Sequence, residues 1–575
     1  MKQVLVNAFL LVIYCPLYAQ LFPVKSYPKK YFRDPLNIPI TLVANFGELR
    51  SNHYHMGLDI RTEGRENLPV FAAADGYIAR VKIEPFGFGQ AIYINHPNGY
   101  TTLYAHLNSF FPALADYIKQ QQYKLETWKI FLELPSGMFP VKKGDLIAFS
   151  GNTGGSEGPH LHFEIRSTLD EMNLNPMLFG LPIPDNVPPV IQRLALYDRT
   201  KSIYEQMPQI FSVKRKGKLF SIIPELLSTS SSKIGFAISA FDTQSGSSNP
   251  NGIFEAIIYD NEKPVIGFQM DNISYTNTRN INAHIDYKKK ANGGSYLQQI
   301  FELPGYKQSI YRMQGGNGTI DISDGSVHLM RIAVKDAYGN ESSLHFKVQY
   351  KFKVQYKPKN SSNSISPGKL FYPFMLDGYE TPDCAFYIGE RCLYDSVHIQ
   401  YARSTSISPD DISMVHSIGA VYIPLQDSFL VRIKSNISLP AAKKEKVLMQ
   451  RLAANKTEIQ KVQWQDDWAS ASFREFGNFQ LVVDEEPPVI LPVGFTDGAN
   501  LSKSSRIEFI IKDNLEEYNN FRAELDGRWL RFTNDKARAF IYKFDENCPP
   551  GKHQLKISVE DEAGNETTQI FNFTR

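Results

Sequence analysis

Two histidines stand two positions apart in the segment "GPHLHFEI", residues 158–165. The segment otherwise has the pattern of a β-strand, in which alternate side chains share a face, so His160 and His162 should lie side by side with Cα atoms roughly 6.6 Å apart. Neutral imidazole is a good ligand for zinc, copper and iron. The pair therefore indicates either a metal site or a polar strand face in contact with solvent, and the pair alone does not decide between them.

Further residues with suitable chemistry precede this pair. The segment "NFGELRSNHYHMGLDI" contains His55 and Asp59, and the glycine between them favours a loop that enters a strand over a helix. The segment "YTTLYAHL" is predicted to be a strand with Thr102, Tyr104 and His106 on one face. A Gly-rich turn, "SGNTGGSEG", leads into the strand with the two histidines.

Three signatures therefore follow one another: H-x-x-x-D, a strand ending in Y-x-H-L, and G-N-T-G followed by G-P-H-L-H-F-E. In this respect the chain resembles the lysostaphin/LytM-type zinc metalloendopeptidases, which cut peptide cross-links of bacterial peptidoglycan. The resemblance covers about residues 40–182, roughly a quarter of the chain. It implies five site residues: the zinc ligands His55, Asp59 and His162, and the catalytic residues His106 and His160.

These roles make chemical sense. Two imidazoles and one carboxylate leave a zinc ion a fourth position for water, as in catalytic zinc sites. Water bound in this way can ionise near pH 7 and attack the scissile carbonyl. The sequence contains no H-E-x-x-H motif, so the glutamate base of thermolysin-like enzymes is missing. His106 and His160 are then the available proton acceptors and oxyanion donors, and the division of roles between them stays open.

Four other features near these motifs have weaker interpretations. His53, two positions from His55, is expected to be a rim or structural residue rather than a site residue, and His96 is expected to support a turn. Glu164 could orient a ligand from the second coordination shell or be an exposed charge at a sheet edge. Residues 109–140 form an insertion whose Pro112 can start a helix. This insertion could be a flap over the substrate groove or a structural element packed on the side of the domain.

Composition limits the classes of function. At 575 residues the chain suggests about three to five domains. Its 62 basic and 60 acidic residues nearly balance, which gives no sign of the basic surface of a nucleic-acid-binding protein. The 30 Tyr and 38 Phe, interleaved with Gly, Pro, Asn and Ser, favour β-rich domains. Cys384 and Cys392 could form a disulfide, or these two and Cys548 could be buried free thiols.

The N-terminal segment has the pattern of a secretory signal peptide, with Lys2, an apolar run and cleavage expected after Ala19. No later segment reaches the length of a membrane span. We therefore expect an exported protein that resides in the periplasm or cell envelope, or is secreted.

Two similar junctions divide the rest of the chain. "DNVPPVI" and "DEEPPVI" each open a β-patterned region, and "VKDAYGNESS" and "VEDEAGNETT" close these regions with a turn that suits a hairpin. The regions resemble the immunoglobulin-like repeats of bacterial surface proteins. The predicted organisation is a signal peptide (1–19), a zinc metallopeptidase domain (20–184), a β-sandwich domain (185–357), a β-rich domain (358–486) and an immunoglobulin-like β-sandwich domain (487–575).

The sequence thus predicts a mostly β protein whose N-terminal antiparallel β domain is a peptidase with one Zn²⁺ ion. Peptidoglycan peptides are the expected substrate, and the β-domain tail could bind an envelope protein. We expect the peptidase domain to fold and act without this tail. The alternative hypothesis is a regulator without hydrolytic activity that binds the cell wall or activates another envelope hydrolase.

Overall fold

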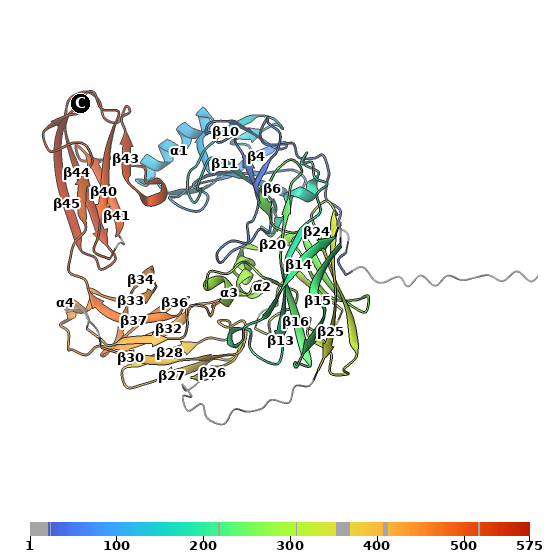
Figure 1. The fold of residues 1–575 in the computed structure, drawn as a ribbon. Coiled ribbons are helices and arrows are strands. Elements are labelled where there is room, and N and C mark those ends of the chain that lie inside the picture. Colours follow the sequence, from blue (N-terminus) through green and yellow to red (C-terminus); the bar gives the residue numbers. More distant parts are fainter. Residues whose placement is uncertain are drawn as a thin grey trace, which may run out of the picture.

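The protein is mostly β in the computed structural model, as the sequence predicts (Figure 1). The structure describes the following residues: 21–23, 25–216, 219–305, 307–314, 316–351, 368–405, 412–454, 456–515 and 518–575. The predicted signal peptide lies outside these residues. We name four modules by the strands they contain: the N-terminal module (β1 to β12), the second module (β13 to β25), the third module (β26 to β37) and the C-terminal module (β38 to β45).

The N-terminal module is built on one large antiparallel sheet with the order β1-β2-β11-β6-β5-β4-β8, and a small sheet β3-β10-β7 packs with it. Its elements are β1 (Leu42–Ala44), β2 (Leu58–Arg61), β3 (Pro69–Phe71), β4 (Gly76–Ile83), β5 (Gln90–Asn95), β6 (Tyr100–Ala105), β7 (Leu107–Phe110), α1 (Pro112–Leu125), β8 (Ile130–Glu133), β9 (Pro140–Val141), β10 (Leu146–Ser150), β11 (His160–Ser167), β12 (Asn173–Leu174) and η1 (Pro176–Phe179).

Strand β11 lies in the middle of this sheet between β2 and β6. Its Leu161 and Phe163 are fully buried in the module's hydrophobic core, as the alternation of the sequence predicts. The cross-strand register sets His160 opposite Arg61 and His162 opposite Asp59. Since cross-strand partners share a face, the sheet itself brings His162 and Asp59 together.

The second module contains a twelve-stranded sheet with the main order β17-β16-β13-β14-β15-β25-β24-β18-β19-β22. Its elements are β13 (Val190–Asp198), η2 (Ile203–Glu205), β14 (Gln209–Lys216), β15 (Leu219–Thr229), β16 (Lys233–Thr243), β17 (Pro250–Asn251), β18 (Glu255–Asp260), β19 (Lys263–Gln269), β20 (Asn272–Ile273), η3 (Tyr275–Asn280), α2 (Ile281–His284), α3 (Tyr287–Ala291), β21 (Gln298–Gln299), β22 (Tyr311–Met313), β23 (Ile320–Asp321), β24 (Val327–Lys335) and β25 (Glu341–Tyr350).

The first two modules share a sheet. Strand β20 of the second module pairs with β12 of the N-terminal module, with Asn173 opposite Ile273 and Leu174 opposite Asn272. The polar side chain of Asn45, which follows β1, exchanges two hydrogen bonds with the backbone of Gly252, at 2.8 and 2.9 Å. The second module is therefore joined to the N-terminal module by sheet pairing as well as by the chain.

The third and C-terminal modules are each built from more than one sheet. The third contains β26 (Lys369–Phe371), β27 (Asp377–Glu380), β28 (Cys384–Ile388), β29 (Val397–Ile399), β30 (Tyr401–Ser404), β31 (Val415–Ile418), β32 (Phe429–Lys434), α4 (Ala441–Lys444), β33 (Val447–Ala453), β34 (Lys456–Lys461), β35 (Gln463–Gln465), β36 (Trp468–Phe473) and β37 (Gly477–Val483). The C-terminal module contains β38 (Val489–Pro492), β39 (Ala499–Asn500), β40 (Arg506–Lys512), β41 (Tyr518–Leu525), β42 (Arg528–Trp529), η4 (Asp535–Ala537), β43 (Phe540–Lys543), β44 (Lys552–Asp561) and β45 (Glu566–Thr574).

The two repeated closing motifs form hairpins, as predicted: β24 pairs with β25, and β44 pairs with β45. In each turn an aspartate, Asp336 or Asp561, accepts a hydrogen bond from the backbone N–H of the asparagine four residues later. In the C-terminal module, a three-stranded and a five-stranded sheet enclose one apolar core, which makes it a β-sandwich. Cys384, Cys392 and Cys548 are buried free thiols.

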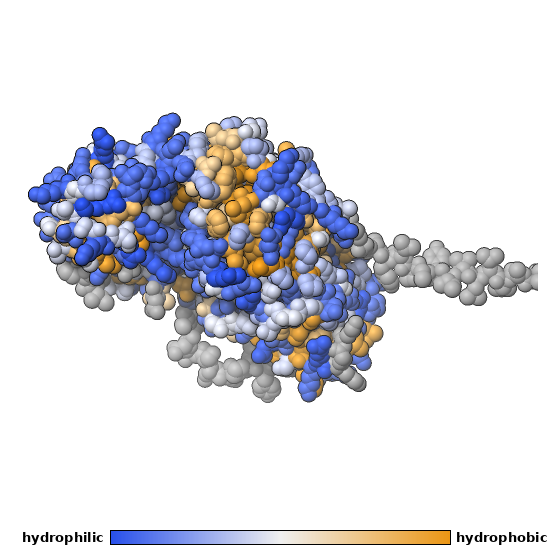
Figure 2. All heavy atoms as spheres, turned by 90° about the horizontal axis from the view of Figure 1, so that it is seen from above, coloured by the Kyte–Doolittle hydropathy of each residue, from blue (hydrophilic) through white to orange (hydrophobic). Residues whose placement is uncertain are grey.

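The four modules form a curved arrangement in which the last returns to the first (Figure 1). The C-terminal module lies beside α1 of the N-terminal module, although the second and third modules separate them in the sequence. Seen from above, the surface of the C-terminal module is mainly hydrophilic, while apolar side chains gather over the neighbouring N-terminal module (Figure 2). No helix among the described residues is long and apolar enough to span a membrane. The four predicted domain boundaries stay predictions, and those at 19/20 and 357/358 lie outside the described residues.

Candidate metal centre and active site

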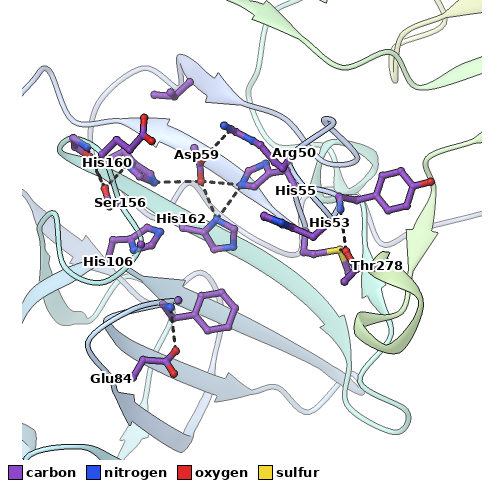
Figure 3. A pocket seen from close by; sticks show the side chains of 18 of the residues that line it. Arg50, His53, His55, Asp59, Glu84, His106, Ser156, His160, His162 and Thr278 are labelled. Carbon is purple, nitrogen blue, oxygen red and sulfur yellow. Dashed lines mark hydrogen bonds and ion pairs between the residues drawn. The ribbon is translucent and has the colours of Figure 1, made fainter. Parts of the chain in front are cut away.

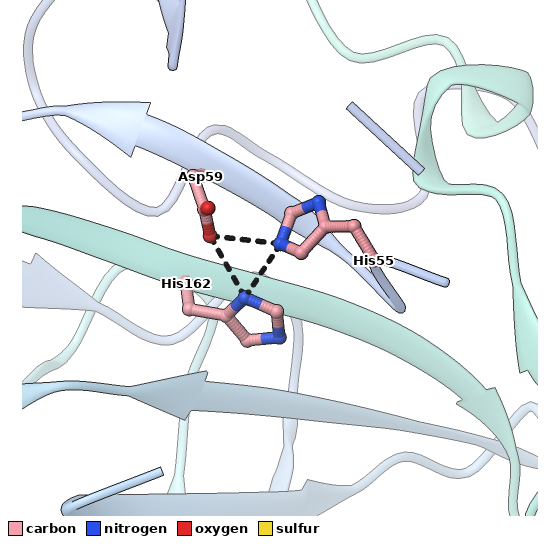
Figure 4. A group of neighbouring side chains, drawn as sticks. All are labelled: His55, Asp59 and His162. Carbon is pink, nitrogen blue, oxygen red and sulfur yellow. Dashed lines mark hydrogen bonds and ion pairs between the residues drawn. The ribbon is translucent and has the colours of Figure 1, made fainter. Parts of the chain in front are cut away.

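Three of the predicted site residues form a compact triangle (Figure 4). Nε2 of His55 lies 3.0 Å from Oδ1 of Asp59 and 3.1 Å from Nδ1 of His162, and Nδ1 of His162 lies 2.8 Å from Oδ1 of Asp59. All three residues are buried. Ligand atoms that surround zinc tetrahedrally at about 2.05 Å are separated by roughly 3.3 Å. Two nitrogens and one oxygen with nearly this spacing could hold a metal ion.

Local features of the sequence bring these atoms together. Asp59 and His162 are opposed in strands β2 and β11, while His55 lies in the loop that enters β2. Gly57 allows this loop to run close to β11, since a Cβ atom at this position would lie 2.5 Å from the carbonyl oxygen of Phe163. The ring of His55 is held on the side away from the triangle, because its Nδ1 donates a hydrogen bond to the carbonyl oxygen of Asn45 at 2.8 Å. Nε2 of His55 is then left to face the centre of the triangle.

Glu164 fixes the second imidazole. Its carboxylate is completely buried and lies 2.9 Å from Nε2 of His162, which leaves Nδ1 of that ring toward Asp59. The carboxylate also accepts hydrogen bonds from Nε of Arg166 at 2.7 Å, Nδ2 of Asn173 at 2.7 Å and the hydroxyl of Tyr275 at 2.8 Å. Of the two interpretations of Glu164, the structure supports the second-shell role, because the side chain is not exposed.

The other two predicted residues, His106 and His160, border the same space (Figure 3). Their ring centroids are 4.8 Å apart, and Nε2 of His160 lies 3.4 Å from Oδ1 of Asp59. Each ring donates its Nδ1 proton to a carbonyl oxygen of the Gly-rich loop, His106 to Thr153 and His160 to Gly158, both at 2.8 Å. The Nε2 atom of the neutral His106 ring therefore carries no proton, while Nε2 of His160 faces the carboxylate of Asp59.

The predicted alternation in "YTTLYAHL" is wrong at its end. Strand β6 stops at Ala105, and His106 has a left-handed backbone with φ of 58°. Cross-strand pairing shows that Ala105 shares a face with His162, so regular alternation would have turned His106 to the other face with Tyr104, whose ring packs against Phe163 in the core. The left-handed residue re-aims the imidazole, which shows how a strained backbone position can serve a site.

Burial and neighbouring charges perturb the acids and bases of the site. Burial alone would raise the pKa of Asp59, but His55 and the hydrogen bonds from His160 and His162 hold it well below its usual value. Burial opposes the charged form of His162, yet Asp59 and Glu164 raise its pKa to about 9. Burial also opposes ionisation of Glu164, and Arg166 and His162 lower its pKa to about 2. The space between the carboxylates thus favours positive charge, as a metal site requires.

His106 differs from these groups. Burial, followed by the proximity of His162 and His160, lowers its pKa to about 3, so the imidazole is neutral at pH 7. A neutral ring with so low a pKa is a weak base, and a proton placed on it would be released readily.

The site opens into a cavity of about 920 Å³. Its walls include Arg50, Phe88 and the 155–160 segment of the N-terminal module, together with Tyr275 and Thr278 of the second module. Tyr275 and Thr278 belong to η3, which follows the shared strand β20. No sequence motif or spacing pointed to these two residues. The role of Arg166 could have been suspected, because it alternates with His162 and Glu164 along one strand face.

The structure also shows where the remaining candidates lie, namely His53, His96 and the insertion of residues 109–140. His53 is exposed at the rim of the cavity and hydrogen-bonds to the carbonyl oxygen of Ser51. His96 supports its turn through the carbonyl oxygen of Asp75 and the hydroxyl of Thr102. The insertion forms α1 and β8, and its helix buries Leu114 and Ile118 in the core of the module. It is therefore a packed structural element, whose outer side contacts the C-terminal module.

Comparison with known proteins matches residues 53–123 and 138–176 to Peptidase family M23, and residues 376–484 to the Zu5-like domain. The DD-carboxypeptidase/endopeptidase Mpg of Neisseria meningitidis is 35% identical over 131 residues, which are 23% of this chain and 24% of that protein. The peptidoglycan DD-endopeptidase ShyA of Vibrio cholerae is 29% identical over 120 residues, 21% of this chain and 22% of that protein. The chain thus matches about a quarter of the length of these relatives.

Among solved structures, a zinc containing peptidase from Vibrio cholerae is 29% identical, with a TM-score of 0.17, and the match covers 25% of this chain and 36% of that one. The residues matched by the family include the three residues of the triangle and the two histidines beside it. Together, the motifs, their geometry and the match show that the chain contains a Peptidase family M23 domain.

Proposed function

We propose that this chain is a zinc-dependent endopeptidase that hydrolyses peptide cross-links of bacterial peptidoglycan. The observation that carries the proposal is the triangle of His55 Nε2, Asp59 Oδ1 and His162 Nδ1 beside two further imidazoles in one open cavity. The M23 domain supports the peptidase chemistry, and the names of the relatives, which include a peptidoglycan DD-endopeptidase, support the substrate. Export to the periplasm or cell envelope fits this substrate.

One zinc ion would be held by His55, Asp59 and His162. When bound, it would polarise the scissile carbonyl and promote the ionisation of water. The protein's own part is to fix the ligands: Asn45 orients His55, and Glu164 orients His162. Because Glu164 is ionised and buried, it also increases the electron density of the His162 ring.

His106 and His160 would move the proton in this reaction. The Gly-rich loop holds both rings by their Nδ1 atoms; Nε2 of His160 then lies 3.4 Å from Oδ1 of Asp59, and His106 lines the same cavity. The low pKa of His106 makes its neutral ring a weak base and makes an imidazolium formed there a strong acid, which would donate its proton readily to the leaving amine. His160, whose ring centroid lies 4.8 Å away, would share in the proton transfer or stabilise the oxyanion. The cavity of about 920 Å³ has room for a branched peptide.

The test is incubation of the purified, zinc-loaded full chain with defined cross-linked muropeptides and identification of the products by mass. We expect cleavage of one peptide bond per cross-link, loss of this cleavage with a chelator and recovery with zinc. Asp59→Ala should lose both zinc and activity. His345→Ala, which removes an exposed imidazole of β25, is the matched control and should retain both. A zinc-loaded wild-type chain that cuts no muropeptide would refute the proposed function.

A further inference from the structure

The C-terminal module contacts the Gly-rich loop that holds both catalytic histidines. Its turn η4 contains Asp535 and Lys536. The carboxylate of Asp535 accepts a hydrogen bond from the backbone N–H of Gly154 at 2.8 Å. The ammonium of Lys536 donates to Oδ1 of Asn152 at 3.2 Å and to the carbonyl oxygen of Ser156. One turn of the last module therefore holds three positions within the 152–156 segment.

The same segment holds the two histidines from its other side. The carbonyl oxygen of Thr153 fixes Nδ1 of His106 at 2.8 Å, and the hydroxyl of Ser156 lies 3.1 Å from Nδ1 of His160. The hydroxyl of Ser156 also donates to the carbonyl oxygen of Gly158, the group that fixes His160. Within this segment, residues that contact the η4 turn therefore stand next to residues that contact the histidines. A shift of the segment would move both imidazole rings.

A second loop is included in this contact. The backbone N–H of Lys536 donates to the carbonyl oxygen of Pro85 at 2.8 Å, in the loop between β4 and β5. This loop packs tightly on the Gly-rich loop, since a Cβ atom at Gly154 would lie 2.2 Å from the backbone nitrogen of Gly89. The loop between β4 and β5 also contains Phe88, which lines the cavity. The carbonyl oxygen of Phe88 accepts a hydrogen bond from the backbone N–H of His106. The turn therefore joins the two loops that border the site.

A wider interface holds the turn in place. Lys119 of α1 forms ion pairs with Asp545 and Glu546, each at 2.7 Å. In the last turn of the helix the ring of Tyr123 packs edge-to-face on Trp529, and Glu126, just after the helix, pairs with Arg522 at 2.7 Å. The insertion that contains α1 is thus the docking surface for the C-terminal module.

The turn supports the site without filling it. Among the described residues, those that line the cavity come from the N-terminal module and from Tyr275 and Thr278, and none comes from the C-terminal module. The hydrogen bonds of Asp535 and Lys536 reach the Gly-rich loop from outside the cavity. This placement argues against a plug that blocks the substrate and in favour of a support for the loop.

We infer that Asp535 and Lys536 are positioning residues of the active site: they hold the 152–156 segment, and through Thr153 and Ser156 they hold His106 and His160. The inference rests on the proposed function, because it assigns the turn a part in that reaction. Misplacement of a reacting group by about 1 Å can cost a hundredfold in rate, so the effect of losing this support should be measurable.

The experiment uses the full chain with Asp535→Ala and Lys536→Met, and with the conservative variants Asp535→Asn and Lys536→Arg. Arg522→Ala is the matched control, since it breaks an ion pair in the same interface and leaves the turn intact. We expect Asp535→Ala and Lys536→Met to keep their zinc and KM while kcat falls about 10- to 100-fold. The pH profile of kcat should also shift, because the surroundings of both histidines change, and the conservative variants should recover part of the rate.

Amide hydrogen exchange of residues 152–156 provides a measure that does not depend on activity. Exchange should become faster in Asp535→Ala, which leaves the N–H of Gly154 without its acceptor, and should not change in Arg522→Ala. If Asp535→Ala and Lys536→Met match Arg522→Ala in kcat and exchange, the inference is wrong. It is also wrong if these variants become faster, because the turn would then be a brake. If wild type cuts no muropeptide, the proposed function fails, and the exchange data alone decide whether the turn positions the loop.

Discussion

Replacing Glu164 by glutamine should separate its effect on the metal from its effect on the fold. One oxygen of the carboxylate accepts from His162 and Tyr275, and the other accepts from Arg166 and Asn173. The amide NH₂ of a glutamine cannot accept from either pair. In either orientation the buried guanidinium of Arg166 loses the charge of residue 164, and if the amide NH₂ faces Arg166 the guanidinium loses the hydrogen-bond acceptor as well. If the NH₂ faces His162, that ring must accept at Nε2 and carry its proton on Nδ1, the atom that faces the metal site.

Both orientations have a cost that can be estimated. Loss of one partner of a buried ion pair typically destabilises a protein by about 3–5 kcal/mol. Loss of a second-shell carboxylate typically weakens metal binding by about 10- to 100-fold, or about 1.4–2.7 kcal/mol. We therefore expect Glu164→Gln to unfold more easily without metal and to bind zinc more weakly. Chemical denaturation and competition with a chromophoric zinc chelator measure the two effects.

The double variant Glu164→Gln with Arg166→Met is the control. It removes both charges of the buried pair, so much of the lost stability should return, whereas the zinc affinity should not, because His162 still lacks its carboxylate. If Glu164→Gln binds zinc as tightly as wild type although it is less stable, Glu164 has only a structural role and the reasoning is refuted.

Three further predictions follow from the structure. His162→Ala should lose zinc and activity together, whereas His160→Ala should keep its zinc in metal analysis and lose about 10²-fold or more in kcat. If both variants lose zinc, both rings are metal ligands and the assignment is wrong. The isolated segment 20–184 should be less stable and at least 10-fold less active than the full chain, because it lacks β20, Tyr275 and the η4 turn. If the segment cuts muropeptides as fast as the full chain, this prediction is wrong. Burial lowers the pKa of His284 from 6.5 to about 3, so the folded state is favoured while this ring is neutral, above pH 6.5, and is destabilised as the pH falls. The free energy of unfolding, measured by denaturation, should therefore fall by about 2 kcal/mol between pH 7.5 and pH 5. This fall should disappear in His284→Gln.

Short-range chemistry predicted part of the geometry of the site, whereas the roles of its five residues came from the family resemblance and stay predictions. His160 and His162 share a face because strands alternate, and the loop at Gly57 and the hairpins at Asp336 and Asp561 follow from turn chemistry. The position of His106 did not follow from alternation, because a single left-handed residue interrupts the strand. A periodic pattern cannot reveal such an interruption.

Contacts between modules could not be predicted. Tyr275 reaches Glu164 from 111 residues away, and no local pattern around it signals this role. The expectation that the first domain acts alone came from the clustering of its motifs and stays a prediction. The pairing of β12 with β20, which no motif signalled, is the structural argument against it. Likewise, no sequence pattern indicated a partner for the insertion, and only the fold shows that Lys119 and Glu126 meet the C-terminal module.

The hydrogen bond between Asp535 and Gly154 joins residues 381 positions apart. Contacts of such separation are the most demanding in loop-closure entropy and tend to form late in folding. A chain made and exported from its N-terminus would have all five site residues in place well before the η4 turn emerged. The rim of the site would then be completed only when the last module had folded and docked on α1. The order of synthesis itself would delay full activity until the whole molecule is assembled, and a chain cut short before Asp535 would never reach that state.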